Sequence, residues 1–165
     1  MASGIFDTDM KIISQSVKDT LKMGRIIAKN LKKGDILCLF GQLGSGKTVL
    51  TKGIASGLGI KKERIISPSF VLIREYAQGK LLLYHFDLYR LKEPKDIFNL
   101  GYEEYLYNNG ITVIEWADRL KYLLPSEFLK IELCLKQGSQ RSLKFKAIGR
   151  RYRDLLDKIH EDIGD

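Results

Sequence analysis

The chain of 165 residues has little of what marks the specialised classes of protein. It holds three prolines, and fifteen glycines that follow no repeat, which excludes collagen-like and low-complexity chains. No apolar run approaches the roughly 18 to 20 residues that a membrane-spanning helix needs. Residues 1–7 are polar and acidic, without the basic start and apolar centre of a signal peptide. We therefore expect a soluble, cytoplasmic protein that does not associate with membranes.

Cysteine is also scarce, since the chain holds only Cys38 and Cys134. Each lies in a short apolar run of the kind that forms a strand, at residues 36–40 and 131–135. Two such cysteines do not indicate a disulfide scaffold. We predict that both are reduced thiols in the core, where a cysteine behaves as a small apolar residue.

Acidic residues are outnumbered by basic ones, 20 to 28, which gives a net charge of +8. The excess is concentrated between Leu133 and Arg153, where no acidic residue occurs. The basic residues of this run are Lys136, Arg141, Lys144, Lys146, Arg150, Arg151 and Arg153. The run is either a solvated strand face and helix start, or a surface that binds phosphates or an acidic partner. Charge alone does not decide between these readings.

The order of the predicted elements indicates a single α/β domain over residues 1–165. Ser16 and Asp19 form a helix-capping pattern, and apolar residues then recur at helical spacing as far as Leu31. Residues 36–40 and 111–116 are apolar runs typical of buried strands. The same patterns predict helices over residues 48–58 and 150–163, and a third helix that begins at Pro94 and ends at Asn108-Asn109-Gly110. They also predict a hairpin of residues 70–76 with 80–87, and an antiparallel strand pair of 128–135 with 142–148.

Residues 41–48, Gly-Gln-Leu-Gly-Ser-Gly-Lys-Thr, match the phosphate-binding loop G-x-x-x-x-G-K-[ST] completely. A buried strand precedes this loop and an amphipathic helix follows it, as the motif requires. In such a loop the backbone N–H groups and the helix N-terminus surround phosphate oxygens. Lys47 would reach the outer phosphates and Thr48 would bind Mg²⁺. The expected nucleotide-binding residues are Gly41, Leu43, Gly44, Ser45, Gly46, Lys47 and Thr48. We expect a P-loop fold, with a mixed, mainly parallel sheet, flanking helices and a C-terminal antiparallel strand pair.

Two predicted strands end in an acid, at Asp87 and Glu115. The carboxyl ends of strands line the ligand crevice of open α/β sheets, so both acids are expected to face the nucleotide. One could hold the metal and the other could orient the attacking water. Trp116, the only tryptophan, is either core or a wall of the site. His85 is better explained as a structural histidine, because no metal-ligand spacing surrounds it.

Several functions compete for this set of residues. The chain lacks the Asn-Lys-x-Asp motif of guanine specificity and an ABC signature, and it is short for a typical AAA+ or RecA-type motor core. A small-molecule kinase is one alternative, in which Tyr89 and Arg90 after Asp87 would bind the acceptor. A nucleotide-gated binding module whose hydrolysis is incidental is another. Ser67-Pro68-Ser69-Phe70, between the helix that follows the phosphate-binding loop and the hairpin, lies where a loop could sense the outer phosphate.

Four motifs, in this order, resemble the TsaE family of bacterial P-loop ATPases of threonylcarbamoyladenosine biosynthesis. They are the 41–48 loop, Ser67-Pro68-Ser69-Phe70, His85-x-Asp87-Leu88-Tyr89-Arg90, and Ile114-Glu115-Trp116. The resemblance covers residues from about 14 to 141. It implies slow ATP hydrolysis that is stimulated by TsaD- and TsaB-type partners, with tRNA reached through that complex. The ATP cycle would reset the TsaD–TsaB catalyst between turnovers.

The resemblance also implies roles for single residues. Lys47 and Thr48 would serve phosphate and Mg²⁺ binding, Asp87 and Glu115 the metal and hydrolysis, and Trp116 the wall of the site. Arg141 resembles a late basic residue near the nucleotide, although its spacing differs. Two departures stand out, because the family most often has threonine in place of Ser69 and commonly has alanine in place of Ser45.

Overall fold

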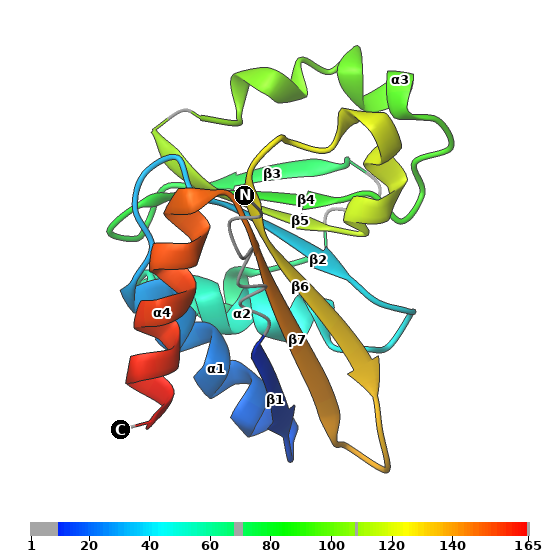
Figure 1. The fold of residues 1–165 in the computed structure, drawn as a ribbon. Helices are drawn as coiled ribbons and strands as arrows, with labels where there is room; N and C mark the ends of the chain where they lie inside the picture. Colours follow the sequence, from blue (N-terminus) through cyan, green and yellow to red (C-terminus); the bar gives the residue numbers. More distant parts are fainter. Residues whose placement is uncertain (1–9, 68–70, 108, 165) are drawn as a thin grey trace, which may run out of the picture.

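A seven-stranded mixed sheet organises the chain (Figure 1). The structure, a computed structural model, describes residues 10–67, 71–107 and 109–164. The strands are β1 (Met10–Ser14), β2 (Ile36–Phe40), β3 (Ile73–Tyr76), β4 (Leu82–Asp87), β5 (Gly110–Glu115), β6 (Phe128–Leu135) and β7 (Arg141–Ile148). Their order across the sheet is β1-β7-β6-β2-β5-β4-β3. The four strands from β6 to β4 are parallel, whereas β1, β7 and β3 run antiparallel to their neighbours. The predicted α/β class and mixed sheet are confirmed.

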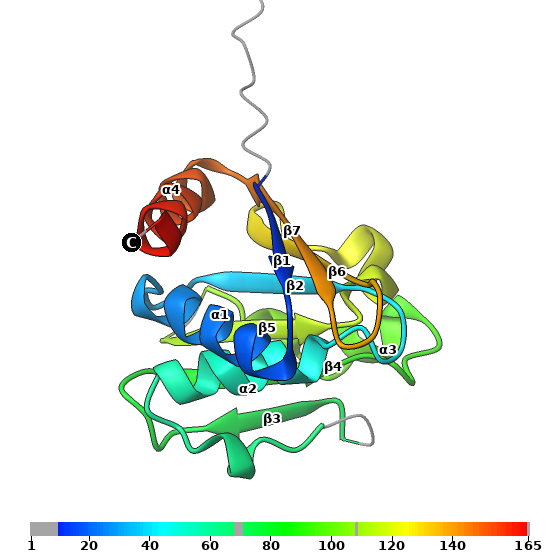
Figure 2. The same ribbon diagram turned by 90° about the horizontal axis from the view of Figure 1, so that it is seen from below.

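Helices cover the two faces of the sheet unequally. One face is covered by α1 (Val17–Lys29), α2 (Lys47–Gly57) and α4 (Arg150–Gly164). The other face is covered mainly over β2, β5 and β4, by α3 (Pro94–Phe98) and the short 3₁₀ segments η2 (Tyr102–Glu104) and η3 (Ala117–Leu123). A further 3₁₀ turn, η1 (Lys62–Arg64), follows α2, and β3 forms one outer edge of the sheet (Figure 2). No helix within the described ranges combines the length and apolar character needed to cross a membrane.

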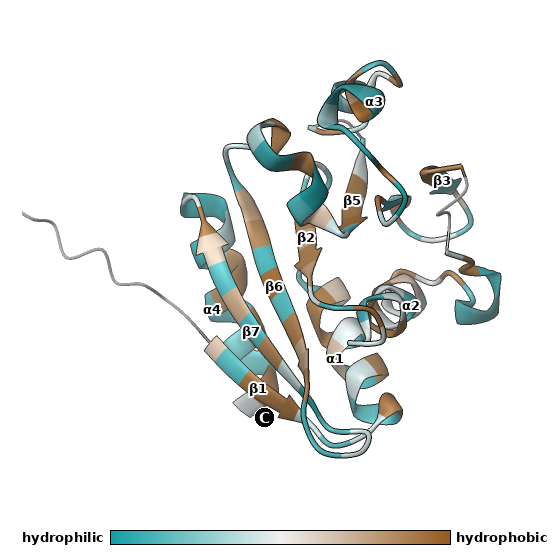
Figure 3. Ribbon diagram, turned by 90° about the vertical axis from the view of Figure 1, so that its right-hand side faces the viewer, coloured by the Kyte–Doolittle hydropathy of each residue, from teal (hydrophilic) through white to brown (hydrophobic). Residues whose placement is uncertain are grey.

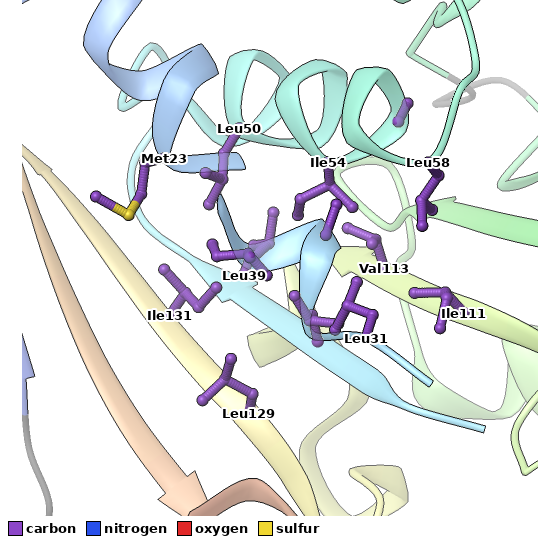
Figure 4. Packing of buried hydrophobic residues seen from close by; sticks show 14 of the residues in the cluster. Met23, Leu31, Leu39, Leu50, Ile54, Leu58, Ile111, Val113, Leu129 and Ile131 are labelled. Atoms are coloured by element: carbon purple, nitrogen blue, oxygen red, sulfur yellow. The ribbon is translucent and has the colours of Figure 1, made fainter. Parts of the chain in front are cut away.

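The central strand β2 is apolar throughout because both of its faces are covered. Leu37 and Leu39 pack in the larger core beneath α1 and α2, which also contains Ile54 and Ile131 (Figure 4). The alternate residues of β2, which include Cys38, pack in the second core beneath α3 and η3. This arrangement follows from the side-chain period of two in a strand. It places β2 between two packed layers, and the loop of residues 41–48 follows directly from its end.

The helices α1 and α2 approach closely because a glycine from each lies at the crossing. A Cβ atom built on Gly24 would lie 2.6 Å from the backbone carbon of Gly53. Ser16 caps α1 as predicted, since its Oγ accepts from the N–H of Asp19 at 3.1 Å. The close crossing positions α2, whose first residue is Lys47, against the sheet.

The structure corrects the predicted helix that begins at Pro94. Only α3 is helical there, and Gly101, with φ of 69°, ends that segment before the separate 3₁₀ turn η2. Phe98, the last residue of α3, is exposed. The strand β1 was absent from the sequence prediction, because five residues at the chain start carry little pattern of their own. Phe70 and Asn108, which bounded two predicted elements, lie outside the described residues.

The prediction of two core thiols is half wrong. Cys38 is fully buried, and burial raises the pKa of its thiol well above the ordinary value. Cys134 is exposed, because it lies on the sheet face that no helix covers at β6. Both cysteines are free thiols. An apolar sequence run therefore did not ensure that both faces of the strand are buried.

The basic run between Leu133 and Arg153 is divided among separate parts of the fold. Lys144 lies within β7, whereas Arg150 and Arg153 are exposed on α4. Arg151 instead serves the fold: its guanidinium binds Asp35 at 2.9 Å and 2.7 Å, through Nε and an Nη atom. The side chain of Asp35 is only 4% exposed, and its hydrogen bond is the main cause that raises the pKa of Arg151. The sequence run is thus not one continuous binding surface.

We predict that Arg151→Gln destabilises the protein, because it leaves the buried Asp35 carboxylate without its charged partner. Lost hydrogen bonds to a charged group cost about 2 kcal/mol. For a domain of this size that corresponds to a fall in Tm of roughly 4 to 8 °C. Arg153→Gln, on the exposed side of the same helix, is the matched control and should leave Tm unchanged. Equal Tm values for the two variants would contradict the structural role of Arg151.

Candidate functional site

The loop of residues 41–48 joins β2 to α2 at the carboxyl end of the sheet. Gly46 lies at the N-cap of α2 with φ of 106°, a conformation that glycine adopts without strain. The Nζ atom of Lys47 donates to the carbonyl oxygens of Gly41 at 2.6 Å and Gln42 at 2.8 Å. The lysine therefore lies folded back across its own loop, where its charge is held by backbone dipoles.

Asp87 and Glu115 end neighbouring parallel strands and are directly opposite each other in the register of β4 and β5. Both are buried, at 4% and 1% exposure. Asp87 accepts hydrogen bonds from the Oγ of Ser67 and from the N–H of Tyr89, the latter at 3.0 Å. The two acids therefore meet at one edge of the sheet.

The carboxylate of Glu115 is held by three side chains from two other elements. Its Oε2 accepts from the Oγ1 of Thr48 at 2.9 Å. Its Oε1 accepts from the Oγ1 of Thr51 at 3.0 Å and lies 2.7 Å from the Nε2 of His85. Because an ionised carboxylate only accepts, the Nε2 of His85 acts as the donor. The Glu115 network, defined as Glu115, Thr48, Thr51 and His85, thus connects β5, α2 and β4.

This network decides the charge state of the site. Burial by itself would raise the pKa of Glu115, but the hydrogen bonds from His85, Thr48 and Thr51 and the charge interaction with His85 outweigh it and lower that pKa. Burial lowers the pKa of Lys47, while Glu115, Asp118 and Asp87 oppose that shift. The Glu115 carboxylate is therefore held ionised by its donors.

Trp116 follows Glu115 in a left-handed backbone conformation, with φ of 57°. Such a conformation costs a large side chain on the order of 1–3 kcal/mol and is typical of functional sites. The indole ring lies 4.0 Å below the Nζ of Lys47, and its centroid is 5.0 Å from that of Tyr89. Trp116 is therefore a wall of the site, in contact with the loop lysine, as well as a neighbour of the second core.

A cavity of about 410 Å³ opens over these residues. Arg141, at the start of β7, also reaches it and donates to the carbonyl of Gly44 at 3.4 Å. The predicted site residues that line the cavity are Leu43, Gly44, Gly46, Lys47, Thr48, Asp87, Glu115, Trp116 and Arg141. Gly41 and Ser45 do not line this cavity but a separate hollow beside Leu133. Ser67, Tyr89 and Arg90 complete the cavity wall.

Sequence reasoning missed Thr51 and undervalued His85. Thr51 lies one helical turn after Thr48, so the two hydroxyls share a face of α2. This three-residue spacing was the sequence signal for a role of Thr51 in the site. It becomes informative only once Glu115 is known to lie opposite that face of α2. His85 is fully buried, and its partner Glu115 is thirty residues away in the chain. It is structural, as predicted, but its contact is with the acid of the site.

The donor set of the site is made of hard oxygen atoms. The Thr48 hydroxyl and the carboxylates of Glu115 and Asp87 all line the cavity. Within the ranges that the structure describes, no group of three or more His, Cys, Asp or Glu side chains forms a closed metal site. Mg²⁺ is usually held by one or two carboxylates together with substrate phosphates, so the residues present fit that ion in company with a nucleotide.

Comparisons of this chain with known proteins agree on one family. The family described as "Threonylcarbamoyl adenosine biosynthesis protein TsaE" matches residues 14–143. A tRNA threonylcarbamoyladenosine biosynthesis protein TsaE of Bacillus subtilis (strain 168) is 39% identical over 151 residues, covering 90% of this chain and 93% of the relative. A protein of the same description from Treponema pallidum (strain Nichols) is 40% identical over 134 residues, covering 81% and 98%.

A solved structure supports the same conclusion. The crystal structure of Bacillus subtilis YdiB matches with a TM-score of 0.84 and 35% identity, covering 95% of this chain and 97% of that one. The sheet and the helices described above are therefore shared over nearly the whole length of both chains.

We predict that the contact between His85 and Glu115 is a major stabilising interaction of the site. His85→Leu should lower the free energy of unfolding by about 3 kcal/mol, because it leaves a buried carboxylate short of a donor. In the His85→Leu background, Glu115→Gln should cost much less than it does in the wild type. Urea denaturation of the four proteins measures this coupling, expected at about 1–3 kcal/mol. Additive effects of the two substitutions would show that the pair is not coupled.

Proposed function

The chain belongs to the TsaE family of tRNA threonylcarbamoyladenosine biosynthesis proteins, and from this premise we propose that it binds and hydrolyses ATP within that machinery. The observation that carries the proposal is the Glu115 network lying directly under the loop of residues 41–48. The network joins the loop helix to the ends of two strands. A Gly-rich loop alone would support binding, whereas a fixed acid beneath it supports hydrolysis.

Nucleotide binding is supported by the electrostatics of the loop. The N-terminus of α2 presents backbone N–H groups to the cavity, and such termini attract phosphate. Lys47 and Arg141 both line the cavity and add two cations to it. Phosphate oxygens would replace the carbonyls of Gly41 and Gln42 as partners of Lys47, since a charged acceptor makes a stronger bond than a carbonyl. The tilted ring pair of Tyr89 and Trp116 forms an aromatic part of the cavity wall.

Hydrolysis is supported by the presence of two acids, Asp87 and Glu115, which can take separate roles. Thr48 and one carboxylate would hold Mg²⁺, which when bound would neutralise charge on the outer phosphates. The second carboxylate would orient a water for attack. Glu115 is the residue held by three donors, while Asp87 is held by a serine hydroxyl and a backbone N–H. We assign the more rigid acid, Glu115, to the support of the transition state.

The proposed partners are TsaD- and TsaB-type proteins, with tRNA reached through their complex in the cytoplasm. The chain would be a slow ATPase on its own, and these partners would stimulate it. Its turnover would reset the TsaD–TsaB catalyst between rounds of modification. A small-molecule kinase would instead require an acceptor for turnover, and a nucleotide-gated module would require binding alone.

We predict that Glu115→Gln keeps ATP binding and lowers ATP hydrolysis by about 10²-fold or more, because it keeps the shape of the side chain and removes its charge. The measurement combines calorimetric titration with ATP and reconstituted tRNA modification in the presence of TsaD and TsaB. Multiple-turnover modification should fail with this variant. Lys47→Ala serves as the control that should lose ATP binding itself.

Three outcomes would redirect the assignment. Wild-type hydrolysis in Glu115→Gln would exclude this acid from the transition state. Full multiple-turnover modification by a variant that binds but does not hydrolyse ATP would favour the nucleotide-gated module. ATP consumption only when a small-molecule acceptor is added would favour the kinase.

A further inference from the structure

The residues from Trp116 to Leu120 form the start of η3, at the end of β5. All residues of β5 are buried, and the strand runs beside β2 (Figure 3). Ala117 and Leu120 are fully buried in the second core. Trp116 and Arg119 are both partly exposed. Two apolar residues thus fix the turn from which the side chains of Trp116 and Arg119 extend.

The 3₁₀ geometry of this turn places Arg119 on the indole ring of Trp116. Side chains three residues apart are eclipsed in a 3₁₀ helix, and the N–H of Arg119 donates to the carbonyl of Trp116 at 3.0 Å. The Cζ atom of Arg119 lies 5.6 Å from the centroid of the ring. A guanidinium is attracted to an aromatic face within about 6 Å. The contact therefore follows from the local backbone and is electrostatically favourable.

The guanidinium of Arg119 lies in an unusual environment for an arginine. Its Nε atom is buried and has no hydrogen-bond partner in the part of the chain that the structure describes. Most buried donors in proteins are paired, so an unpaired one calls for an explanation. The ring of Trp116 is the contact that the structure gives to this cation, and a ring attracts a desolvated cation more strongly than an exposed one. The contact with Trp116 therefore accounts for the position of the side chain.

The ring of Trp116 has a second cation that nucleotide binding would remove. The Nζ of Lys47 lies 4.0 Å from the ring centroid, and phosphate oxygens would draw it away because a charged acceptor binds it more strongly. Tyr89, the aromatic neighbour of the ring, itself lines the cavity and is 39% exposed. Arg119 lies outside the described lining of the cavity. A nucleotide in the cavity would therefore leave the contact between Arg119 and the ring intact.

We propose that Arg119 is a positioning residue of the nucleotide site, an inference that rests on the proposed ATP-binding function. The backbone of Trp116 has φ of 57°, and a strained conformation of this kind persists only where the surroundings hold it. Arg119 holds the indole from outside the cavity, so that the ring stays a fixed wall after Lys47 has left it. Arg119 acts through Trp116 and does not touch the nucleotide. Its loss should weaken nucleotide binding without slowing the turnover of bound nucleotide.

The test uses the fluorescence of Trp116, which reports the ring directly because it is the only tryptophan of the chain. Arg119→Gln removes the charge and Arg119→Lys keeps it. Arg153→Gln, exposed on α4, is the matched control. Acrylamide quenching of the tryptophan is measured on each full-length protein with and without a non-hydrolysable ATP analogue. Calorimetry gives the ATP affinity, steady-state hydrolysis gives kcat and KM, and circular dichroism confirms the fold.

Arg119→Gln should bind ATP roughly three- to tenfold more weakly and raise KM by a similar factor, while kcat stays within about twofold of the wild type. Acrylamide should quench Trp116 more efficiently in this variant, most clearly with the analogue bound, when Lys47 no longer covers the ring. Arg119→Lys should recover most of the affinity, because it keeps a cation on the ring. Arg153→Gln should match the wild type in every measurement.

A double-substitution cycle tests whether Arg119 acts through the ring. In a Trp116→Leu background, Arg119→Gln should cost less than about twofold in ATP affinity, because the ring that it supports is gone. A loss of full size in that background, wild-type affinity and quenching in Arg119→Gln, or an equal loss in Arg119→Lys would each overturn the positioning role alone. Absence of ATP binding by the wild type would instead overturn the proposed function, and this inference with it.

Discussion

The buried carboxylate of Glu115 is the point at which the sheet, the loop helix and the neighbouring strand are joined. A charge at 1% exposure is stable only when donors replace the water that it has lost. Thr48 and Thr51 supply two of these donors from α2, and His85 supplies the third from β4. The same contacts that keep the charge buried also fix the orientation of α2 relative to β5. Because α2 carries the loop lysine at its start, the geometry of the loop depends on this network.

The loop lysine shows how the site can respond to a ligand. Lys47 is held by two backbone carbonyls and the face of Trp116, all of which are partners that a phosphate can replace. The carboxylates of Glu115 and Asp87, which attract its charge, are engaged with their own donors. The lysine can therefore move without breaking a buried ion pair. The strained backbone of Trp116 keeps an aromatic surface beside it in the present arrangement.

The sequence allowed much of this to be predicted where the signal is local. The capping pair before α1, the complete 41–48 motif and the acids that end two apolar strands depend on residues close together in the chain. His85, Thr51 and Arg151 could not be assigned from sequence, because each acts through a partner brought near only by the tertiary fold. The helix predicted from Pro94 failed because Gly101 adopts a left-handed conformation that periodicity does not reveal. Cys134 was misplaced because strand patterning cannot show which sheet face lacks a covering helix.

The central claim is that the cavity over the Glu115 network is a nucleotide site in which Lys47 changes partners. A crystal structure of the protein with Mg²⁺ and a non-hydrolysable ATP analogue tests it most directly. The account predicts that the Nζ of Lys47 leaves the carbonyls of Gly41 and Gln42 for phosphate oxygens, while Glu115 keeps its contacts with His85 and Thr51. An analogue bound away from this cavity, or bound within it with Lys47 still on the two carbonyls, would contradict the account.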